Sequence, residues 1–266
     1  MAAAEKAQGV FIRIEIMKSI NFDHSYTEDA GHRFFKALGR SGFVLSENEV
    51  EHPGKQFCRF IMFKHGSGRV YLEFVRVGKG GEPIDKPGVS LRYTGPLKRY
   101  FGAIKARKDI KAKYIHKNYA WKKDSKSALP GWNFLTFLSP KFKNIYLWFT
   151  EYESHPTKKR VTPPPHPNTA HTIAGLELIV RGSDRPKLEK VFGKSLNGKE
   201  VSLGGIRLFI ESGRSTKVAA VVIKCKDLKR FKKLANIKST ILWRGQSAVL
   251  IKNPQPKMWD IVVLEE

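Results

Sequence analysis

Cysteine is scarce in this chain, because Cys58 and Cys225 are the only two among 266 residues. Two isolated cysteines supply neither a disulfide framework nor a CxxC metal-binding pair. Both lie among apolar residues, which predicts buried free thiols. Long apolar runs are also missing: residues 10–16 are too short and too charged for a signal-peptide core or a membrane span. We therefore expect a soluble, cytoplasmic protein without a membrane partner.

The motifs of several enzyme classes are missing as well. The glycine-rich residues 78–81 are followed by Glu82 and Pro83 rather than by a helix, so they do not form a phosphate-binding loop. The chain has no GxSxG nucleophile turn and no HExxH zinc motif, and neither cysteine follows a catalytic Cys–His pattern. These absences exclude the best-known hydrolase, metalloprotease and nucleotide-binding signatures.

Acidic residues are few relative to basic ones, with 24 Asp and Glu against 49 Lys and Arg and a net charge of +25. Such an excess attracts polyanions. Two dense basic runs, residues 105–126 and 224–238, could form a phosphate-tracking surface for nucleic acid, and the first run also holds aromatic residues that stack on bases. The alternative is ordinary solvated faces, which we prefer because no known nucleic-acid-binding motif accompanies the charge. In the first run, the basic residues concerned are Lys105, Arg107, Lys108, Lys111, Lys113, Lys117, Lys122 and Lys123.

What the chain does contain is a repeated order of one strand, one helix and three strands. The first unit is predicted at residues 20–27, 30–38, 43–45, 57–64 and 69–77. The second is predicted at residues 89–93, 97–107, 112–115, 132–138 and 145–151. The third, at residues 175–180, 184–192, 200–203 and 206–211, lacks one strand. The fourth is predicted at residues 218–224, 227–235, 240–243, 248–252 and 259–265.

This fourfold repeat predicts an α+β fold of four βαβββ modules, the third abbreviated, paired into two lobes with curved mixed sheets. The expected boundaries are an N-terminal extension at residues 1–19, a first lobe at 20–155, a proline-rich crossing at 156–171 and a second lobe at 172–266. The similar cores Val70-Tyr71-Leu72-Glu73-Phe74 and Ile145-Tyr146-Leu147-Trp148-Phe149 support the repeat.

Several short motifs on this repeat carry a family resemblance. They are Phe22-Asp23-His24, Tyr71-Leu72-Glu73, His155-Pro156, His166-Pro167-Asn168 and Ala174-Gly175. With the βαβββ order, residues 20–265 resemble the vicinal-oxygen-chelate superfamily, which includes glyoxalase I, extradiol dioxygenases, fosfomycin-resistance proteins and bleomycin-binding proteins. More narrowly, the chain looks like the glyoxalase-like domain family.

The resemblance implies that the first and fourth strands of a unit lie side by side and that their inward residues line a cup. His24 and Glu73 are then expected to face each other as candidate catalytic residues or metal ligands. The matching positions of unit two are Ser90, with Arg92 two residues further on the same face, and Trp148.

A metal site of the superfamily also takes ligands from the partnering unit, and here the chain departs from the pattern. Ser90 and Trp148 are the candidates in unit two, and the equivalents in the second lobe lie near Leu176, Val221 and Val263. Leu, Val and Trp do not bind metals. The crossing would have to supply His155, His166 or His171.

Three interpretations follow for the first lobe. In a metal-free pocket, Arg92 and Ser90 bind a small anionic or aromatic molecule, Trp148 or Trp132 stacks on it and His24 donates a hydrogen bond. In a lyase, isomerase or dioxygenase, His24 and Glu73 hold Zn, Ni, Mn or Fe. In the third, His24 and Glu73 only satisfy each other in a wall without function, and Trp132 and Trp148 pack in the core. We favour the pocket without a cofactor, and we expect the apolar second lobe to fill its own cup or to serve as a homodimer surface.

Overall fold

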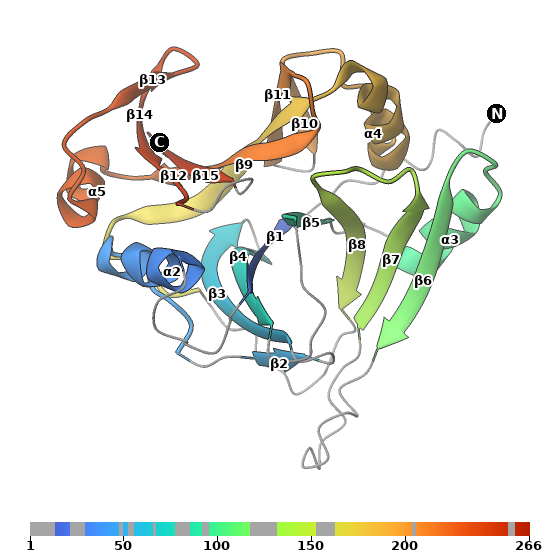
Figure 1. The fold of residues 1–266 in the computed structure, drawn as a ribbon. Helices are drawn as coiled ribbons and strands as arrows, with labels where there is room; N and C mark the ends of the chain where they lie inside the picture. The colour runs from blue at the N-terminus through green and yellow to red at the C-terminus, as the bar shows by residue number, and fades with distance from the viewer. Residues whose placement is uncertain are drawn as a thin grey trace, which may run out of the picture.

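The chain was analysed as a computed structural model (Figure 1). It describes residues 14–21, 30–47, 50–52, 56–65, 68–77, 86–91, 96–117, 132–152, 163–203, 206–254 and 259–266. None of the helices in these ranges is long and apolar enough to cross a membrane.

The first lobe contains two complete βαβββ units in one sheet of eight strands. Unit one comprises β1 (Ile14–Asn21), α2 (Ala30–Arg40), β2 (Val50–His52), β3 (Gln56–His65) and β4 (Gly68–Val77). Unit two comprises β5 (Gly88–Leu91), α3 (Leu97–Lys105), β6 (Lys111–Lys117), β7 (Trp132–Ser139) and β8 (Tyr146–Tyr152). The strand order is β2-β3-β4-β1-β5-β8-β7-β6. In each unit the first and fourth strands are parallel neighbours, and the antiparallel pair β1–β5 joins the two units at the centre.

The second lobe repeats this plan in a sheet of seven strands. Unit three comprises β9 (Ala170–Val180), the short 3-10 helix η1 (Gly182–Asp184), α4 (Arg185–Phe192), β10 (Glu200–Leu203) and β11 (Ile206–Ser212). Unit four comprises β12 (Lys217–Cys225), α5 (Leu228–Ala235), β13 (Ile241–Trp243), β14 (Gln246–Ile251) and β15 (Asp260–Glu265). The order is β10-β11-β9-β12-β15-β14-β13, again with an antiparallel central pair, β9–β12. The predicted fold is confirmed, including the third unit that is one strand short.

Three predicted elements were placed wrongly. The first strand runs over Ile14–Asn21 rather than residues 20–27, because the apolar and β-branched residues before residue 20 suit a central strand paired on both sides. Residues 43–45 form no strand: the Phe43 N–H bonds to Leu38 O at the end of α2, and the Val44 N–H bonds to His166 Nδ1. Strand β9 starts at Ala170, five residues before the expected position, because its pairing with β12 continues to Cys225.

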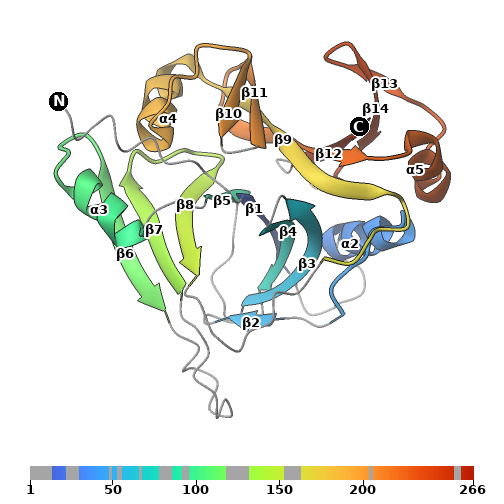
Figure 2. The ribbon, with the colours of Figure 1, turned by 180° about the vertical axis from the view of Figure 1, so that it is seen from behind.

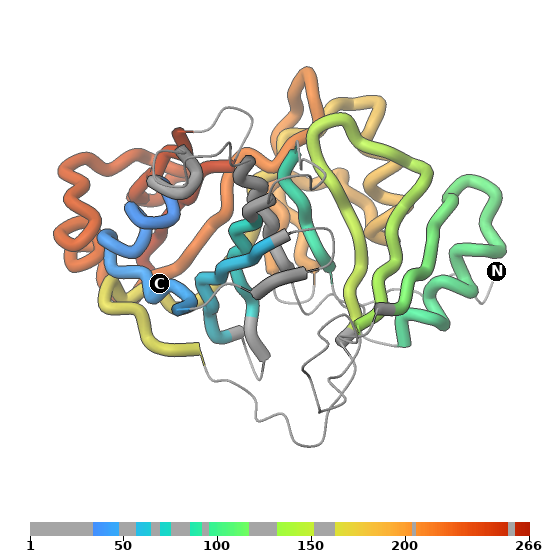
Figure 3. The backbone as a smooth tube through the Cα atoms, turned by 60° about the horizontal axis from the view of Figure 1, so that its bottom comes forward, coloured from blue at the N-terminus to red at the C-terminus, as the bar shows by residue number. Residues whose placement is uncertain are grey.

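The two lobes lie against each other with a helix pair at each end. Figures 1 and 2 show α2 beside α5 at one end and α3 beside α4 at the other. The Tyr100 hydroxyl on α3 donates to Val191 O on α4 (3.2 Å), and the rings of Phe43 and Phe231 meet at 5.7 Å at the other end. Figure 3 shows the yellow segment that leads into β9 passing beside the blue α2.

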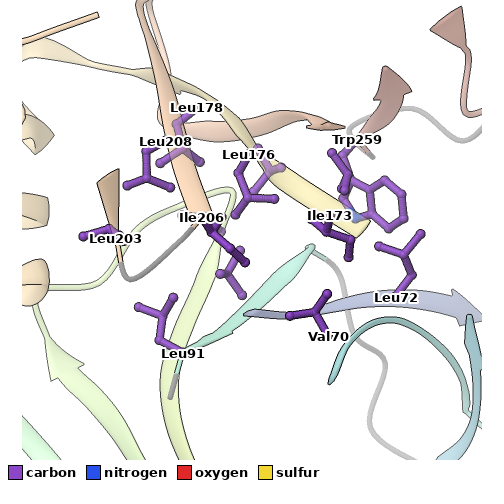
Figure 4. Packing of buried hydrophobic residues seen from close by; sticks show 14 of the residues in the cluster. Val70, Leu72, Leu91, Ile173, Leu176, Leu178, Leu203, Ile206, Leu208 and Trp259 are labelled. Carbon is purple, nitrogen blue, oxygen red and sulfur yellow. The ribbon is translucent and has the colours of Figure 1, made fainter. Parts of the chain in front are cut away.

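One hydrophobic core spans both lobes. Val70, Leu72 and Leu91 of the first sheet face Ile173 and Leu176 of the second (Figure 4), and all five are at most 1% exposed. Each sheet therefore turns one face to the other lobe and the helices. The opposite face is the one on which the family resemblance implies a cup, and we call it the cup face of that lobe.

Candidate ligand-binding site

The cup of the first lobe is identified by strand alternation. On β4, Val70, Leu72 and Phe74 belong to the shared core, so Tyr71 and Glu73 lie on the opposite face of the sheet. The Glu73 side chain is only 7% exposed and is partnered. A buried, partnered carboxylate on this face marks the cup as polar, because charged groups are seldom buried without a role in pairing or binding.

The expected neighbour of Glu73 was His24, and the register of β1 gives a different residue. Glu73 has Met17 as its Cα partner on β1 and Phe60 on β3. Strand β1 ends at Asn21, opposite Val77. His24 lies outside the described residues, so a site that joins His24 and Glu73 stays a prediction, and the displaced strand gives it no support.

In unit two, Ser90 and Trp148 are Cα partners on the adjacent parallel strands β5 and β8. Their chain neighbours Val89, Leu91, Leu147 and Phe149 point into the shared core, which leaves Ser90, Trp148 and Thr150 on the cup face. The Ser90 and Thr150 hydroxyls lie 2.7 Å apart, and the Trp148 indole N–H donates to Thr150 Oγ1 at 3.0 Å. Thr150 was not predicted from the sequence, although its place two residues after Trp148 could have revealed it.

In this hydrogen-bond chain, one hydroxyl hydrogen remains without an acceptor among the described residues. Ser90 and Thr150 together carry two hydroxyl hydrogens, and their mutual bond uses one. Thr150 also accepts from Trp148. Within the described ranges neither hydroxyl has a further acceptor, while Ser90 is 1% and Thr150 2% exposed. The pair is therefore suited to donate one hydrogen bond to an oxygen atom of a molecule in the cup.

Aromatic rings surround this polar pair. The Trp148 ring packs at 5.2 Å from the Tyr146 ring, and the Trp132 ring meets Phe134 edge-on at 5.7 Å. Trp148 and Trp132 are each 4% exposed, whereas Tyr146 is 43% exposed. Burial raises the pKa of the Tyr146 phenol, partly offset by a hydrogen bond with Thr136, so the phenol is protonated at neutral pH. The sequence analysis missed Tyr146, whose signal is its match to Tyr71 in the repeated core.

The crossing supplies no ligand to this cup from the residues that the structure describes. Arg92 and His155 lie outside those residues. His171 lies on β9, where burial lowers the pKa of its imidazole and the Glu266 carboxylate, 3.5 Å away, opposes that shift.

His166 joins the lobes instead of binding a ligand. Its Nδ1 accepts the Val44 N–H at 2.9 Å, and its Nε2 donates to Met62 O at 3.0 Å. The ring is 6% exposed and lies edge-on to Phe43 and Phe63. Burial lowers the pKa of His166 to about 4, only partly opposed by the bond to Met62, so the ring is neutral near pH 7. With both nitrogens occupied, it does not fit a metal ligand.

Asn168 completes the joint between the lobes. Its Nδ2 donates to Ser41 O at 2.8 Å, and its Oδ1 accepts the Ala170 N–H at 3.1 Å. Gly42 allows this approach: its φ is +82°, and a Cβ there would lie 3.0 Å from Asn168 Cβ. The His-Pro-Asn motif of the crossing is thus structural.

The second lobe closes its cup with apolar side chains. Leu176, Val221 and Val263 point into the shared core, and the neighbours of Val221 and Val263 on the opposite face belong to a separate buried cluster. The neighbour of Leu176 on that face is the half-buried Glu177, whose Cα partners are Phe209 and Ala220. That cluster consists of Phe209, Ala220, Val222, Trp243, Ala248, Val262 and Leu264. Its residues are at most 9% exposed, so this cup is filled by its own side chains, as expected.

A metal ion does not fit the described donor set. No group of three or more His, Cys, Asp or Glu side chains comes together among the described residues. On the cup face of unit two, the positions that would supply further ligands carry Ser90 and Trp148.

The basic run after α3 is partly neutralised. Lys105, Arg107, Lys108, Lys111 and Lys113 are exposed, whereas the side chains of Lys117, Lys122 and Lys123 lie outside the description. Asp109 pairs with both Arg107 and Lys190, at 3.1 Å each. Hydrogen bonds from Arg107 and then Lys190 hold the pKa of the Asp109 carboxyl well below its usual range.

Comparison with solved structures agrees with this architecture. A hypothetical protein from Staphylococcus aureus aligns with a TM-score of 0.53 at 11% identity, over 96% of this chain and 99% of its own. The catechol dioxygenase BphC aligns with a TM-score of 0.51 at 10% identity, over 96% and 86%. A complex of homoprotocatechuate 2,3-dioxygenase from Brevibacterium fuscum with 3,4-dihydroxyphenylacetate aligns with a TM-score of 0.54 at 9% identity, over 97% and 80%.

No family model and no curated protein matches the chain. At these identities the structural likeness shows the fold, which is that of the vicinal-oxygen-chelate proteins, extradiol dioxygenases among them. It does not extend to the reaction.

Proposed function

We propose that this chain is a glyoxalase-like protein of the vicinal-oxygen-chelate superfamily, and that its first lobe binds a small aromatic or anionic molecule without a metal ion. The observation that carries the proposal is the buried Ser90–Thr150–Trp148 chain with its surplus hydroxyl donor. Buried polar groups are normally satisfied, so a surplus donor in a cup calls for an acceptor oxygen.

The wall of the cup favours an aromatic molecule that carries oxygen. Trp148 and Tyr146 present flat rings, the Ser90–Thr150 pair presents the donor, and Glu73 adds an acceptor. A phenolic hydroxyl on a ring can accept from the Ser90–Thr150 pair and donate to Glu73, whereas a carboxylate or carbonyl oxygen can only accept from the pair. If Arg92 also faces the cup, it adds a charged donor for a carboxylate.

The alternative is a lyase, isomerase or dioxygenase that depends on a divalent metal. The fold is compatible with it, but the described ligand positions are not. Untagged protein that carries stoichiometric Zn, Ni, Mn or Fe, and binds or turns over a probe only when the metal is present, would support this alternative instead.

Calorimetric titration tests the proposal with phenylacetate, catechol and 3,4-dihydroxyphenylacetate as probes, each with and without EDTA. We expect at least one probe to bind equally well in EDTA. Thr150→Val should weaken that binding by about tenfold, the cost of one lost hydrogen bond. Thr240→Val, at an exposed position of the second lobe, is the matched control and should bind as the wild type does.

Two results would contradict the metal-free pocket. One is binding that EDTA abolishes and a metal restores. The other is equal binding by the Thr150→Val and wild-type proteins, because the hydroxyl chain would then have no part in the site.

A further inference from the structure

The end of the molecule formed by α2 and α5 carries exposed cations on both helices. Lys36 and Arg40 lie on α2, and Lys229, Arg230 and Lys233 lie on α5. We call these five residues the α2–α5 face. It lies apart from the cup of the first lobe, so an inference about it holds whether or not that cup binds a small molecule.

The two helices are held in place by the joint between the lobes. The Phe43 ring, just after α2, meets the Phe231 ring of α5 at 5.7 Å. Leu234 of α5 lies close to Gly42. Figures 1 and 2 both show the helices side by side. The cations of the two lobes therefore lie on two neighbouring helices.

Among the described residues, no acid neutralises this face. Neither helix contains an Asp or Glu, and the two nearest acids of α5 are occupied at its start: Asp227 accepts the Arg230 N–H at 2.8 Å, and Glu265 accepts the Leu228 N–H at 3.1 Å. Within the described ranges, none of the five cations forms an ion pair.

The opposite end, formed by α3 and α4, differs in this respect. There Asp109 pairs with Arg107 and Lys190, and Asp184 pairs with Lys187 at 2.9 Å. Both ends are basic, but ion pairs within the protein occupy several cations at the α3–α4 end. The α2–α5 end keeps its cations available to a partner.

The spacing of the cations indicates the kind of anion. Lys36 and Arg40, and likewise Lys229 and Lys233, are four residues apart on their helices, which places each pair about 6 Å apart on one side. Two short rows of cations match a chain of regularly spaced negative charges better than they match a single small anion.

The absence of exposed rings distinguishes a duplex from a single strand. Phe34 and Phe35 of α2 and Phe231 of α5 are at most 4% exposed, and the large apolar side chain exposed on the described part of this face is Leu234. Single strands are held largely by stacking on aromatic side chains, whereas a duplex presents its phosphates. We propose that the α2–α5 face binds the phosphate backbone of duplex nucleic acid without reading its sequence.

Fluorescence anisotropy with labelled DNA and RNA duplexes of about 20 base pairs, titrated with the full chain at several salt concentrations, tests this inference. The test variant is Lys229→Glu with Arg230→Glu and Lys233→Glu. The control variant is Lys98→Glu with Arg99→Glu and Lys108→Glu, which makes the same change of charge at exposed positions of the other end. Circular dichroism melts establish that both variants are folded. If the test variant is not folded, Lys229→Ala with Lys233→Ala replaces it, with Lys98→Ala and Lys108→Ala as its control.

We expect the wild type to bind both duplexes with an affinity that falls as salt rises. The test variant should bind at least about tenfold more weakly, with a salt slope shallower by about 3, one unit for each lost phosphate contact. The control should lose less than about threefold, since only the general attraction of the net charge is reduced.

Three outcomes would overturn the inference. Equal losses in the two variants would show that diffuse charge, not this face, attracts the duplex. Tighter binding of a single strand of the same length would contradict the argument from stacking. Binding to phosphatidylserine vesicles but not to either duplex would assign the face to a membrane surface instead.

Discussion

The two cups of this protein have the same backbone plan and opposite contents. In the first lobe, the central strands place Glu73, Ser90, Trp148 and Thr150 on the cup face, and hydrogen bonds join the last three. In the second lobe, the corresponding strands place Phe209, Val222 and Val262 there, packed against one another. The βαβββ module therefore determines that each lobe has a cup face, but not whether that face binds a ligand. A few side chains on alternating positions decide whether the face binds or packs.

The largest expected effect is in the packed cup. Phe209 is 5% exposed, and its ring meets Trp243 edge-on at 4.8 Å. Phe209→Ala should lower the free energy of unfolding by about 3–5 kcal/mol, because it removes a buried ring and leaves a cavity. Urea denaturation measures the loss. Phe209→Leu should cost clearly less, and a loss below about 1 kcal/mol for the alanine variant would mean that this cup is not packed as described.

The joint between the lobes should make stability depend on pH. The pKa of His166 is about 4 when folded against a reference value of 6.5, so the unfolded chain binds the extra proton between these values. Unfolding free energy should be highest above pH 6.5 and should fall by roughly 3 kcal/mol as the pH drops to 4.

Denaturation at a series of pH values checks this dependence. His166→Gln preserves one donor and one acceptor but does not titrate, so its stability should vary much less with pH. His171, whose pKa is also lowered, contributes equally to both proteins. An unchanged slope in the glutamine variant would assign the pH dependence elsewhere.

A substitution on the polar cup face should lower stability less than one on the apolar cup face, and it should also weaken ligand binding. Thr150→Val keeps the shape of the side chain but leaves the Trp148 N–H and the Ser90 hydroxyl without Thr150. We expect a loss of about 1–3 kcal/mol in unfolding free energy, less than for the apolar cup. If Thr150→Val costs more than Phe209→Ala, the contrast between a binding cup and a packing cup fails.

The smallest expected loss of stability is at the N-termini of the helices. In α5 the Asp227 carboxylate caps the Arg230 N–H, whereas in α3 the N-cap is Pro96, and Glu151 of β8 accepts the Leu97 N–H from outside the helix at 3.2 Å. Asp227→Ala should cost about 1 kcal/mol, and Asp227→Asn should cost less. Thermal melts of the two variants measure the difference. Equal melting temperatures for the alanine variant and the wild type would show that Glu265 alone suffices to cap α5.

Much of the fold was predictable because it repeats. The short periodic elements, the helix at Ala30–Arg40 and the shortened third unit all follow from local patterns that recur along the chain. The first strand was misplaced because two overlapping segments both have strand character, and only pairing with β4 and β5 decides between them.

The candidate site was less predictable, because its key contacts are not local. Ser90 and Trp148 could be matched by counting from the helix, but the bond from Ser90 to Thr150 joins residues sixty positions apart. His166 was a candidate metal ligand because histidine is a common metal ligand in proteins. Its hydrogen bonds to two backbone groups more than a hundred residues away show a structural role instead. The sequence alone could not predict those contacts.

The single core that runs through both lobes has a consequence for any attempt to divide the chain. Leu72 and Leu91 share one buried core with Ile173 and Leu176, so a fragment that ends at the crossing would expose part of its apolar sheet face to water. Such a fragment should aggregate during expression, and co-expression of the missing half should restore soluble protein. The two lobes are therefore expected to unfold together as one cooperative unit.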